Sequence, residues 1–329
     1  MSADSHPAPA IVPPPPDRPL RVGMISNVTS GRNRRRLAHL RRALDGGEIL
    51  HHETDCREAM VAAVDELLAR RVGLLVINGG DGTLHATLTA LLRAAPAQLP
   101  MVAVLSGGTT NMNALDVGLS GYPERTVARL LQWAAAPRPT AIRWRPLLAV
   151  RPGEQPTEYG MFLGAGAIVQ GIHYCRERIH TLGIRDSLAP GVTTLRALLG
   201  IVRREARFTS AETISVGLDG EPPDSADWWL FLVSTLERLF LSLRPYWGQG
   251  EGPLHYSAVR AGAHRPLTTL PGLLYGRVGG ASAERGYHSH HLRSLHFWSE
   301  GQFALDGEFF SARHGVAVSA TQPLAFVRP

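Results

Sequence analysis

Short apolar runs alternate with amphipathic segments along the chain up to about residue 140. The runs at 20–26, 74–77 and 100–105, with a weaker one at 48–54, are typical of strands buried on both faces of a parallel sheet. The segments between them repeat apolar residues at helical spacing, over 34–44, 56–70 and 84–92. Because strands and helices alternate, the pattern predicts a doubly wound parallel α/β domain.

Beyond that point Gly and Pro punctuate short strand-like runs at regular intervals. This pattern is typical of antiparallel β structure, and only residues 190–204 show convincing helical periodicity. The predicted fold is therefore an α/β domain followed by an all-β domain, an antiparallel β-sandwich. The expected strands are 141–150, 159–168, 212–218, 228–234, 254–259, 271–277, 292–298, 302–305 and 315–327.

The change of pattern divides the 329 residues, a long chain for one hydrophobic core, into two predicted domains. The α/β domain is expected over residues 19–142 and the β-rich domain over 143–317. The last strand, near 318–329, would return to the first domain. Residues 1–18, with prolines at 13–16, predict a disordered tail that favours the polyproline conformation.

Charge and composition narrow the chemistry. Lys and Arg together number 34, all of them are Arg, and the formal net charge of +6 favours anionic partners. A genomic composition bias would explain the high Arg content equally well. The absence of lysine excludes a Walker A lysine, a protein-kinase strand lysine and a Schiff-base lysine. Two cysteines give no disulfide framework, and no stretch has the length of a membrane span or the pattern of a secretory signal.

The most informative segment joins an apolar strand, Leu74–Ile77, to the sequence Asn78-Gly79-Gly80-Asp81-Gly82-Thr83 and then to a predicted helix. Glycines at a strand–helix junction let backbone N–H groups approach an anion without interference from Cβ. Asp81 adds a carboxylate, which would repel a phosphate unless it holds a metal or takes a proton. The combination indicates phosphoryl chemistry.

Two further turns are expected at the same edge of the sheet, because each follows a parallel strand. They are Asn27–Gly31 after the first strand and Ser106–Asn111 after the fourth. Together with the glycine loop at 79–83, these turns would line the ligand-binding edge.

The loop Gly79–Thr83 resembles that of the diacylglycerol kinase catalytic-domain family, which includes sphingosine kinases and bacterial lipid kinases; NAD kinases share the loop. The resemblance covers nearly the whole chain, from about residue 20 to the end. Further matches to the family pattern are Asn27-Val28-Thr29-Ser30-Gly31, in which Val28 replaces a proline, Thr54 after the second strand, Gly108-Thr109-Thr110-Asn111, the small-residue strand Gly164–Ala167, and Asp306-Gly307-Glu308.

The resemblance implies an NAD kinase-like first domain that binds ATP with Mg²⁺, and a second domain that holds a lipid with a free hydroxyl. Asp306 would be the general base, Asp81 and Glu308 would complete the catalytic centre, and Asp81 would hold Mg²⁺ through a water molecule. The implied nucleotide-binding residues are Asn27, Ser30, Gly31, Thr54, Gly79, Gly80, Asp81, Gly82, Thr83, Gly108, Thr109 and Asn111.

Departures from the family pattern leave alternatives open, since each loses or moves an acidic group. They are Ala86, Met112 and Glu251, where family members carry Glu, Asp and Asp. These departures favour a non-catalytic nucleotide- or lipid-binding relative as one rival. An NAD kinase is the other, although those enzymes carry a glutamate directly after the asparagine, where this chain has Met112. The dipeptide Asp306-Gly307 is also typical of a plain hairpin turn.

The expected partners are a lipid substrate and, transiently, a membrane surface, for a cytoplasmic protein that is peripheral at the inner membrane face. No specific nucleic acid is expected, and a homodimer is left open. Arg34–Arg36 would either reach a phosphate or form a solvated basic face. Residues 190–204 would border a lipid entrance or pack on the β domain. Four histidines, His288, His290, His291 and His296, suggest a metal, but no acid or cysteine completes the set.

Overall fold

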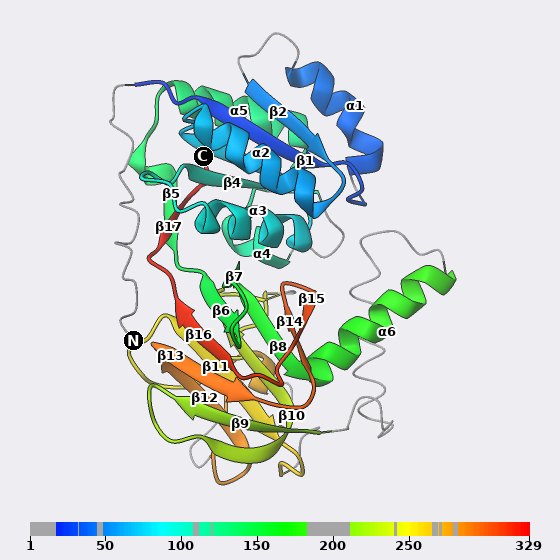
Figure 1. Cartoon of the computed structure of the whole chain (residues 1–329), viewed down its shortest axis with the longest axis vertical. Helices are drawn as coiled ribbons and strands as arrows, with labels where there is room; N and C mark the ends of the chain where they lie inside the picture. Colours follow the sequence, from blue (N-terminus) through cyan, green and yellow to red (C-terminus); the bar gives the residue numbers. More distant parts are fainter. Residues whose placement is uncertain are drawn as a thin grey trace. The chain divides into compact units, whose positions relative to one another are not determined.

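The structure is a computed structural model, and it divides into two compact units (Figure 1). Unit 1 comprises Met1–Gly108, Val117–Pro146 and Gln322–Pro329, and unit 2 comprises Thr109–Asp116 and Leu147–Thr321. The predicted tail, apart from Arg18, and the helix predicted at 190–204 lie outside the described residues. The described residues are 18–31, 33–44, 49–107, 112–119, 121–182, 211–239, 242–264, 269, 272–278 and 282–329.

Unit 1 is built on a six-stranded sheet with the order β2-β1-β3-β4-β17-β5. The first four strands and β17 run parallel to their neighbours, and β5 pairs antiparallel with β17 at one edge. The strands are β1 (Val22–Asn27), β2 (Ile49–Thr54), β3 (Leu74–Gly79), β4 (Met101–Ser106), β5 (Ile142–Arg145) and β17 (Leu324–Val327).

Helices cover both faces of this sheet, as the alternating pattern predicts (Figure 1). On one face α1 (Asn33–Leu44) and α5 (Pro123–Ala135) pack their apolar residues on alternate strand positions, such as Met24 and Val76. On the other face, a Cβ at Gly23 would meet Leu67, which places α2 (Arg57–Ala69) there, with α3 (Asp81–Arg93) beside it. The described residues of the first half also include the helix α4 (Met112–Val117), which belongs to unit 2 up to Asp116, and the 3-10 turn η1 (Pro139–Ala141).

The strand order creates a topological switch point between β1 and β3. The chain passes from β1 to β2 on one side, and then crosses to β3 on the other side of β1. Connections that leave in opposite directions open a crevice at the carboxyl ends of such strands, where α/β proteins bind ligands. In this sheet those ends are Asn27 and Gly79.

Unit 2 is an eleven-stranded antiparallel sheet. The longest strand, β10, pairs first with β9 and then, past an irregularity at Trp229, with β8, while β11 lines its other edge. Its core contains Phe231, Phe297 and Phe303. The strands are β6 (Leu148–Pro152), β7 (Glu158–Gly160), β8 (Phe162–Gly166), β9 (Glu212–Leu218), β10 (Asp224–Ser234), β11 (Leu254–Arg260), β12 (Tyr287–Leu292), β13 (Ser294–Trp298), β14 (Gln302–Leu305), β15 (Glu308–Ser311) and β16 (Val316–Ala320).

The structure corrects four expectations about the second half. The run 141–150 is two strands, β5 and β6, and the run 315–327 is also two, β16 and β17; in each case the two strands belong to different sheets. The segment 271–277 is not a strand, because Gly272–Leu274 is helical and turns at Tyr275. A helix that the periodicity did not predict, α6 (Ala167–Leu182), follows β8 directly. No helix within the described ranges is long and apolar enough to span a bilayer.

Candidate functional site

The glycine loop lies at the switch point, where β3 ends at Gly79 and α3 begins at Asp81. Gly80 is the N-cap residue with extended backbone angles and, as a glycine, makes no side-chain cap hydrogen bond. The first hydrogen bond of the helix runs from Leu84 N to Gly80 O, at 3.0 Å. The N–H groups of Asp81, Gly82 and Thr83 therefore precede the intrahelical ladder and present the positive end of the helix dipole.

Close packing requires glycine at two positions around the loop. A Cβ on Gly79 would lie 2.4 Å from the Cβ of Thr83. A Cβ on Gly107, just after β4, would lie 2.9 Å from Asn33 Oδ1 and from Gly79 N. Gly107 N also donates to Gly79 O at 2.9 Å, so the turn after β4 is held against the loop.

Asn27 links the first turn to the start of α3. Its Nδ2 donates to Thr83 Oγ1 at 2.9 Å, and its Oδ1 accepts from Thr29 N at 2.8 Å and Thr29 Oγ1 at 2.7 Å. The neighbouring Val28 donates its N–H to Thr54 O at 2.9 Å. A proline, as in the family pattern, has no N–H to make this bond, so Val28 adds a connection between the ends of β1 and β2.

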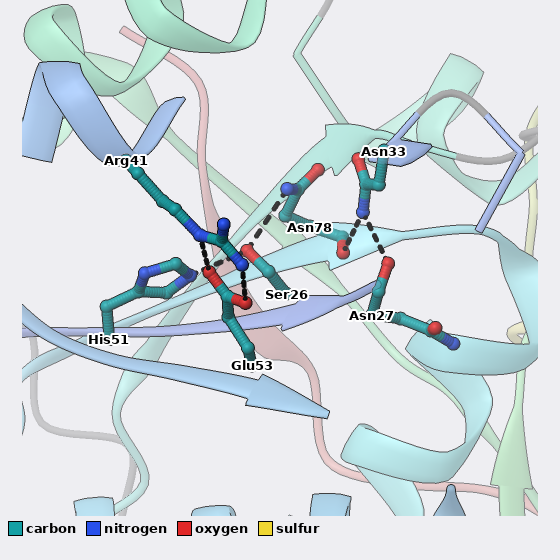
Figure 2. A network of polar contacts seen from close by, with 7 residues as sticks. All are labelled: Ser26, Asn27, Asn33, Arg41, His51, Glu53 and Asn78. Atoms are coloured by element: carbon teal, nitrogen blue, oxygen red, sulfur yellow. Dashed lines mark hydrogen bonds and ion pairs between the residues drawn. The ribbon is translucent and has the colours of Figure 1, made fainter. Parts of the chain in front are cut away.

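A polar network continues from the loop toward the outer strand β2 (Figure 2). Asn78 Nδ2 donates to Ser26 Oγ at 3.1 Å, and His51 Nε2 lies 2.9 Å from the same hydroxyl. Burial lowers the pKa of His51. Farther out, Arg41 Nε donates to Glu53 Oε1 at 2.6 Å, and this hydrogen bond lowers the pKa of Glu53.

Asn33 closes the gap between the two strands at the switch point (Figure 2). Its Nδ2 donates to Asn27 O at 2.8 Å and to Asn78 O at 3.0 Å. The Thr54 hydroxyl, at the end of β2, is buried without a hydrogen-bond partner in the described part of the chain. The sequence patterns assigned no role in the site to Ser26, Asn33 or Asn78. For Asn78 a signal was available, because it is a polar residue at the end of an apolar strand.

The structure brings many of the predicted nucleotide-binding residues to one edge of unit 1. Thr54 ends β2, and the Asn27–Gly31 turn is held by Ser30 N to Asn27 O at 3.4 Å and by Asn33 N to Ser30 O at 3.0 Å. The glycine loop supplies Gly79, Gly80, Asp81, Gly82 and Thr83. The remaining predicted residues, Gly108, Thr109 and Asn111, lie outside the described residues.

Asp306 lies in unit 2, in the two-residue loop of the β14–β15 hairpin. Asp306 has φ 49° and Gly307 has φ 91°, as a type I′ turn requires. Its buried carboxylate accepts two backbone hydrogen bonds, from Phe162 N to Oδ1 and from Met161 N to Oδ2, each 3.0 Å. The hairpin interpretation is therefore confirmed, and the carboxylate also clasps the turn between β7 and β8.

The remaining acidic candidate and the residues that depart from the family pattern differ in burial. Glu308 begins β15 and is exposed. Two residues that depart from the family pattern differ in setting: Ala86 is buried in α3, whereas the Glu251 side chain is 92% exposed and lies 3.9 Å from Arg293.

The remaining polar candidates have structural partners. Arg36 lies over the Tyr122 ring, 5.1 Å from its centroid. His291 Nδ1 lies 3.0 Å from His255 Nδ1, and the His290 ring stacks on Tyr256. Within the described ranges, no group of three or more His, Cys, Asp or Glu side chains is arranged to hold a metal ion.

An α/β unit with a glycine loop at its switch point, combined with a second antiparallel β unit, defines a kinase-type fold. Residues 21–138 match the family model of the diacylglycerol kinase catalytic domain. The match spans β1 through α5 and confirms, over that segment, the resemblance seen in the sequence. A comparison with curated proteins found no significant match.

Solved structures support the fold over nearly the full length. A diacylglycerol kinase from Bacillus anthracis str. Sterne has a TM-score of 0.63 and 13% identity, and the match covers 94% of this chain and 97% of that chain. Two further structures from the same organism, assigned provisionally to the same class, have TM-scores of 0.65. Their sequence identities to this chain are 15% and 16%. The matches cover 94% and 92% of this chain, and 97% and 94% of those chains, respectively. At such low identity the likeness establishes the two-unit fold alone.

Proposed function

We propose that the protein is an ATP-dependent lipid kinase, which transfers the γ-phosphate to a hydroxyl of a diacylglycerol-like or sphingoid lipid. The observation that carries the proposal is the Gly79–Thr83 loop, placed at the switch point of a parallel sheet and leading into a helix whose N-cap residue is a glycine. Since the chain has no lysine, the phosphates would be held by backbone amides, arginines and metal. The family match over this segment supports the same chemistry.

The loop residues fit a triphosphate and its metal. Positioning and charge stabilisation provide most of the catalysis in phosphoryl transfer, and the amides of Gly80–Thr83 would supply both. Because Cβ atoms are absent at Gly79 and Gly107, the loop packs directly on the Thr83 side chain and on the turn after β4. Mg²⁺, when bound, neutralises phosphate charge. It takes oxygen ligands and keeps several waters, which suits the single carboxylate of Asp81.

Asp306 is the proposed general base for the acceptor hydroxyl. A base held by two backbone N–H groups has a fixed orientation, which helps proton transfer at one site. A positioned base contributes about 10²–10⁴-fold to a rate. Glu308, two residues along, is the proposed second acid of this centre. The lipid and a transient membrane contact belong to the same proposal.

Two rivals predict different products. An NAD kinase would phosphorylate NAD, and a non-catalytic relative would bind ATP or lipid without turnover. The buried Ala86 specifically favours the second rival, since α3 lacks the glutamate that many members carry beside the loop.

A product assay separates the three. The purified chain is incubated with ATP, Mg²⁺ and a total lipid extract, and lipids heavier by one phosphate are sought by mass spectrometry. A parallel reaction replaces the lipid with NAD and measures NADP. We expect a new phospholipid and no NADP; formation of NADP alone, or ATP binding with neither product, would overturn the proposal.

A further inference from the structure

We infer that Asn33 is a positioning residue for the glycine loop: its side-chain amide holds together the two strand ends from which the phosphate-binding backbone starts. The expected effect on ATP rests on the proposed function, whereas the effect on loop geometry does not. Asn33 lies two residues beyond the Asn27–Gly31 motif, and none of the sequence motifs includes it.

The contacts of Asn33 use both hydrogens of one nitrogen. The residue is only 2% exposed, and Nδ2 donates to the main-chain oxygens of Asn27 and Asn78, at 2.8 and 3.0 Å (Figure 2). Because both neighbours are carbonyl acceptors, the amide orientation is fixed: the oxygen of Asn33 cannot take either place. A serine in its place would have one donor, and an aspartate would have none.

The Asn33 amide lies at the point in the fold where the backbone pairing between β1 and β3 stops. The backbone pairing between β1 and β3 ends at Ser26 and Asn78. Beyond that pair the chain turns away from each strand in a different direction, because this is the switch point. Asn33, the first residue of α1, replaces the missing backbone rung by bonding the last carbonyls on both sides.

Three turns of the candidate site depend on this bridge. The carbonyl of Asn78 is followed directly by Gly79 and Gly80, the residues that lead into α3. Asn27, the other carbonyl partner, holds Thr83 through its own side chain. On its remaining side, the Asn33 amide oxygen lies 2.9 Å from the point that a Cβ of Gly107 would occupy. The Asn33 amide therefore acts with the Asn27–Thr83 and Gly107–Gly79 hydrogen bonds to set the direction of the loop N–H groups.

The test uses three variants of the full chain. Asn33→Ala removes both bonds, and Asn33→Ser keeps one donor. Thr126→Val is the matched control, since Thr126 is 3% exposed and donates to Tyr122 O at 3.0 Å within α5 of the same unit. Each is measured by hydrogen exchange of peptides that span residues 76–84, and by equilibrium binding of ATP with Mg²⁺.

We expect Asn33→Ala to accelerate exchange at residues 79–83 and to weaken ATP binding at least about tenfold, the effect of losing two ordinary hydrogen bonds. For both loop exchange and ATP affinity, Asn33→Ser should lie between Asn33→Ala and wild type. If Asn33→Ala does not fold, the values for Asn33→Ser decide the test. Thr126→Val should change neither quantity. The inference is overturned if the Asn33 variants and Thr126→Val have the same loop exchange. If wild type binds no ATP, the proposed function fails while exchange still decides the role of Asn33.

Discussion

At the scale of single residues, Asp306 combines a structural role with the proposed chemical one, and two substitutions separate them. Asp306→Asn keeps a residue suited to a type I′ turn and one acceptor oxygen but removes the charge, whereas Asp306→Ala removes both backbone bonds at a left-handed φ. We expect Asp306→Asn to bind ATP normally and to slow transfer at least about a hundredfold. Single-turnover kinetics and ATP titration measure the two effects.

Stability supplies the control for this prediction. Hydrogen bonds to charged groups contribute about 1.5–3 kcal/mol each, so Asp306→Ala should lower the free energy of unfolding by roughly 3 kcal/mol or more. Asp306→Asn should lose clearly less. An Asp306→Asn protein that transfers phosphate at the wild-type rate would leave Asp306 with the hairpin role alone.

His51 predicts a pH dependence of stability in unit 1. Burial lowers its pKa from the ordinary value of 6.5, while Glu53 opposes the shift and His52 and Arg41 add to it. The unfolded chain therefore binds this proton more readily, and stability falls as pH drops through 6.5 toward the lowered pKa. His288 and His290, whose pKa values are also lowered by burial, act in the same direction.

Thermal unfolding from about pH 7.5 to about pH 5.5 tests this prediction. The melting temperature of wild type should fall across the range, and that of His51→Gln, which keeps a polar partner for Ser26, should fall less. Equal slopes for the two proteins would show that His51 does not contribute.

At the scale of elements, the junction between β3 and α3 should tolerate no side chain at Gly79. In Gly79→Ala the new Cβ would lie 2.4 Å from the Cβ of Thr83, so the first turn of α3 must move. We expect the affinity for ATP to fall at least about tenfold, because the helix N–H groups lose their common direction. Equilibrium titration of ATP measures this loss.

A glycine elsewhere provides the matched control. Gly171 lies inside α6, and a Cβ there would meet no atom within 4 Å. Gly171→Ala should leave ATP affinity unchanged and stabilise the helix by about 0.5–1 kcal/mol. Unchanged ATP affinity in Gly79→Ala would contradict the assignment of the loop to phosphate binding.

The same scale shows what the sequence could predict. The predictions for β1 through β4, with α1, α2 and α3, follow from apolar periodicity, since buried parallel strands and amphipathic helices have distinct patterns. Helix α6 was not predicted because it begins right after the strand residue Gly166, whose φ of 65° lets the chain turn directly from strand to helix. The glycine loop was visible as a motif. The bridge of Asn33 and the clasp of Asp306 were not, because each depends on tertiary neighbours far away in sequence.

At the scale of the whole molecule, the two units carry different parts of the proposed reaction. Unit 1 contains the glycine loop and, apart from Thr109–Asp116, the segment that matches the diacylglycerol kinase family, while unit 2 contains Asp306 and Glu308. The acidic residues that the sequence lacks at 86 and 112 make turnover the open question for this chain. The central claim is therefore that the protein transfers phosphate from ATP to a lipid, and not only that it binds one of these substrates.

The most direct measurement is the initial rate at which label moves from γ-labelled ATP into the lipid fraction, for wild type and Asp81→Asn side by side. Asp81 starts α3 at the end of a strand, so Asp81→Asn should fold normally, which thermal unfolding checks. We predict labelled phospholipid from wild type and none above background from Asp81→Asn. Wild type that binds ATP but labels no lipid, or equal labelling by both proteins, would contradict the account.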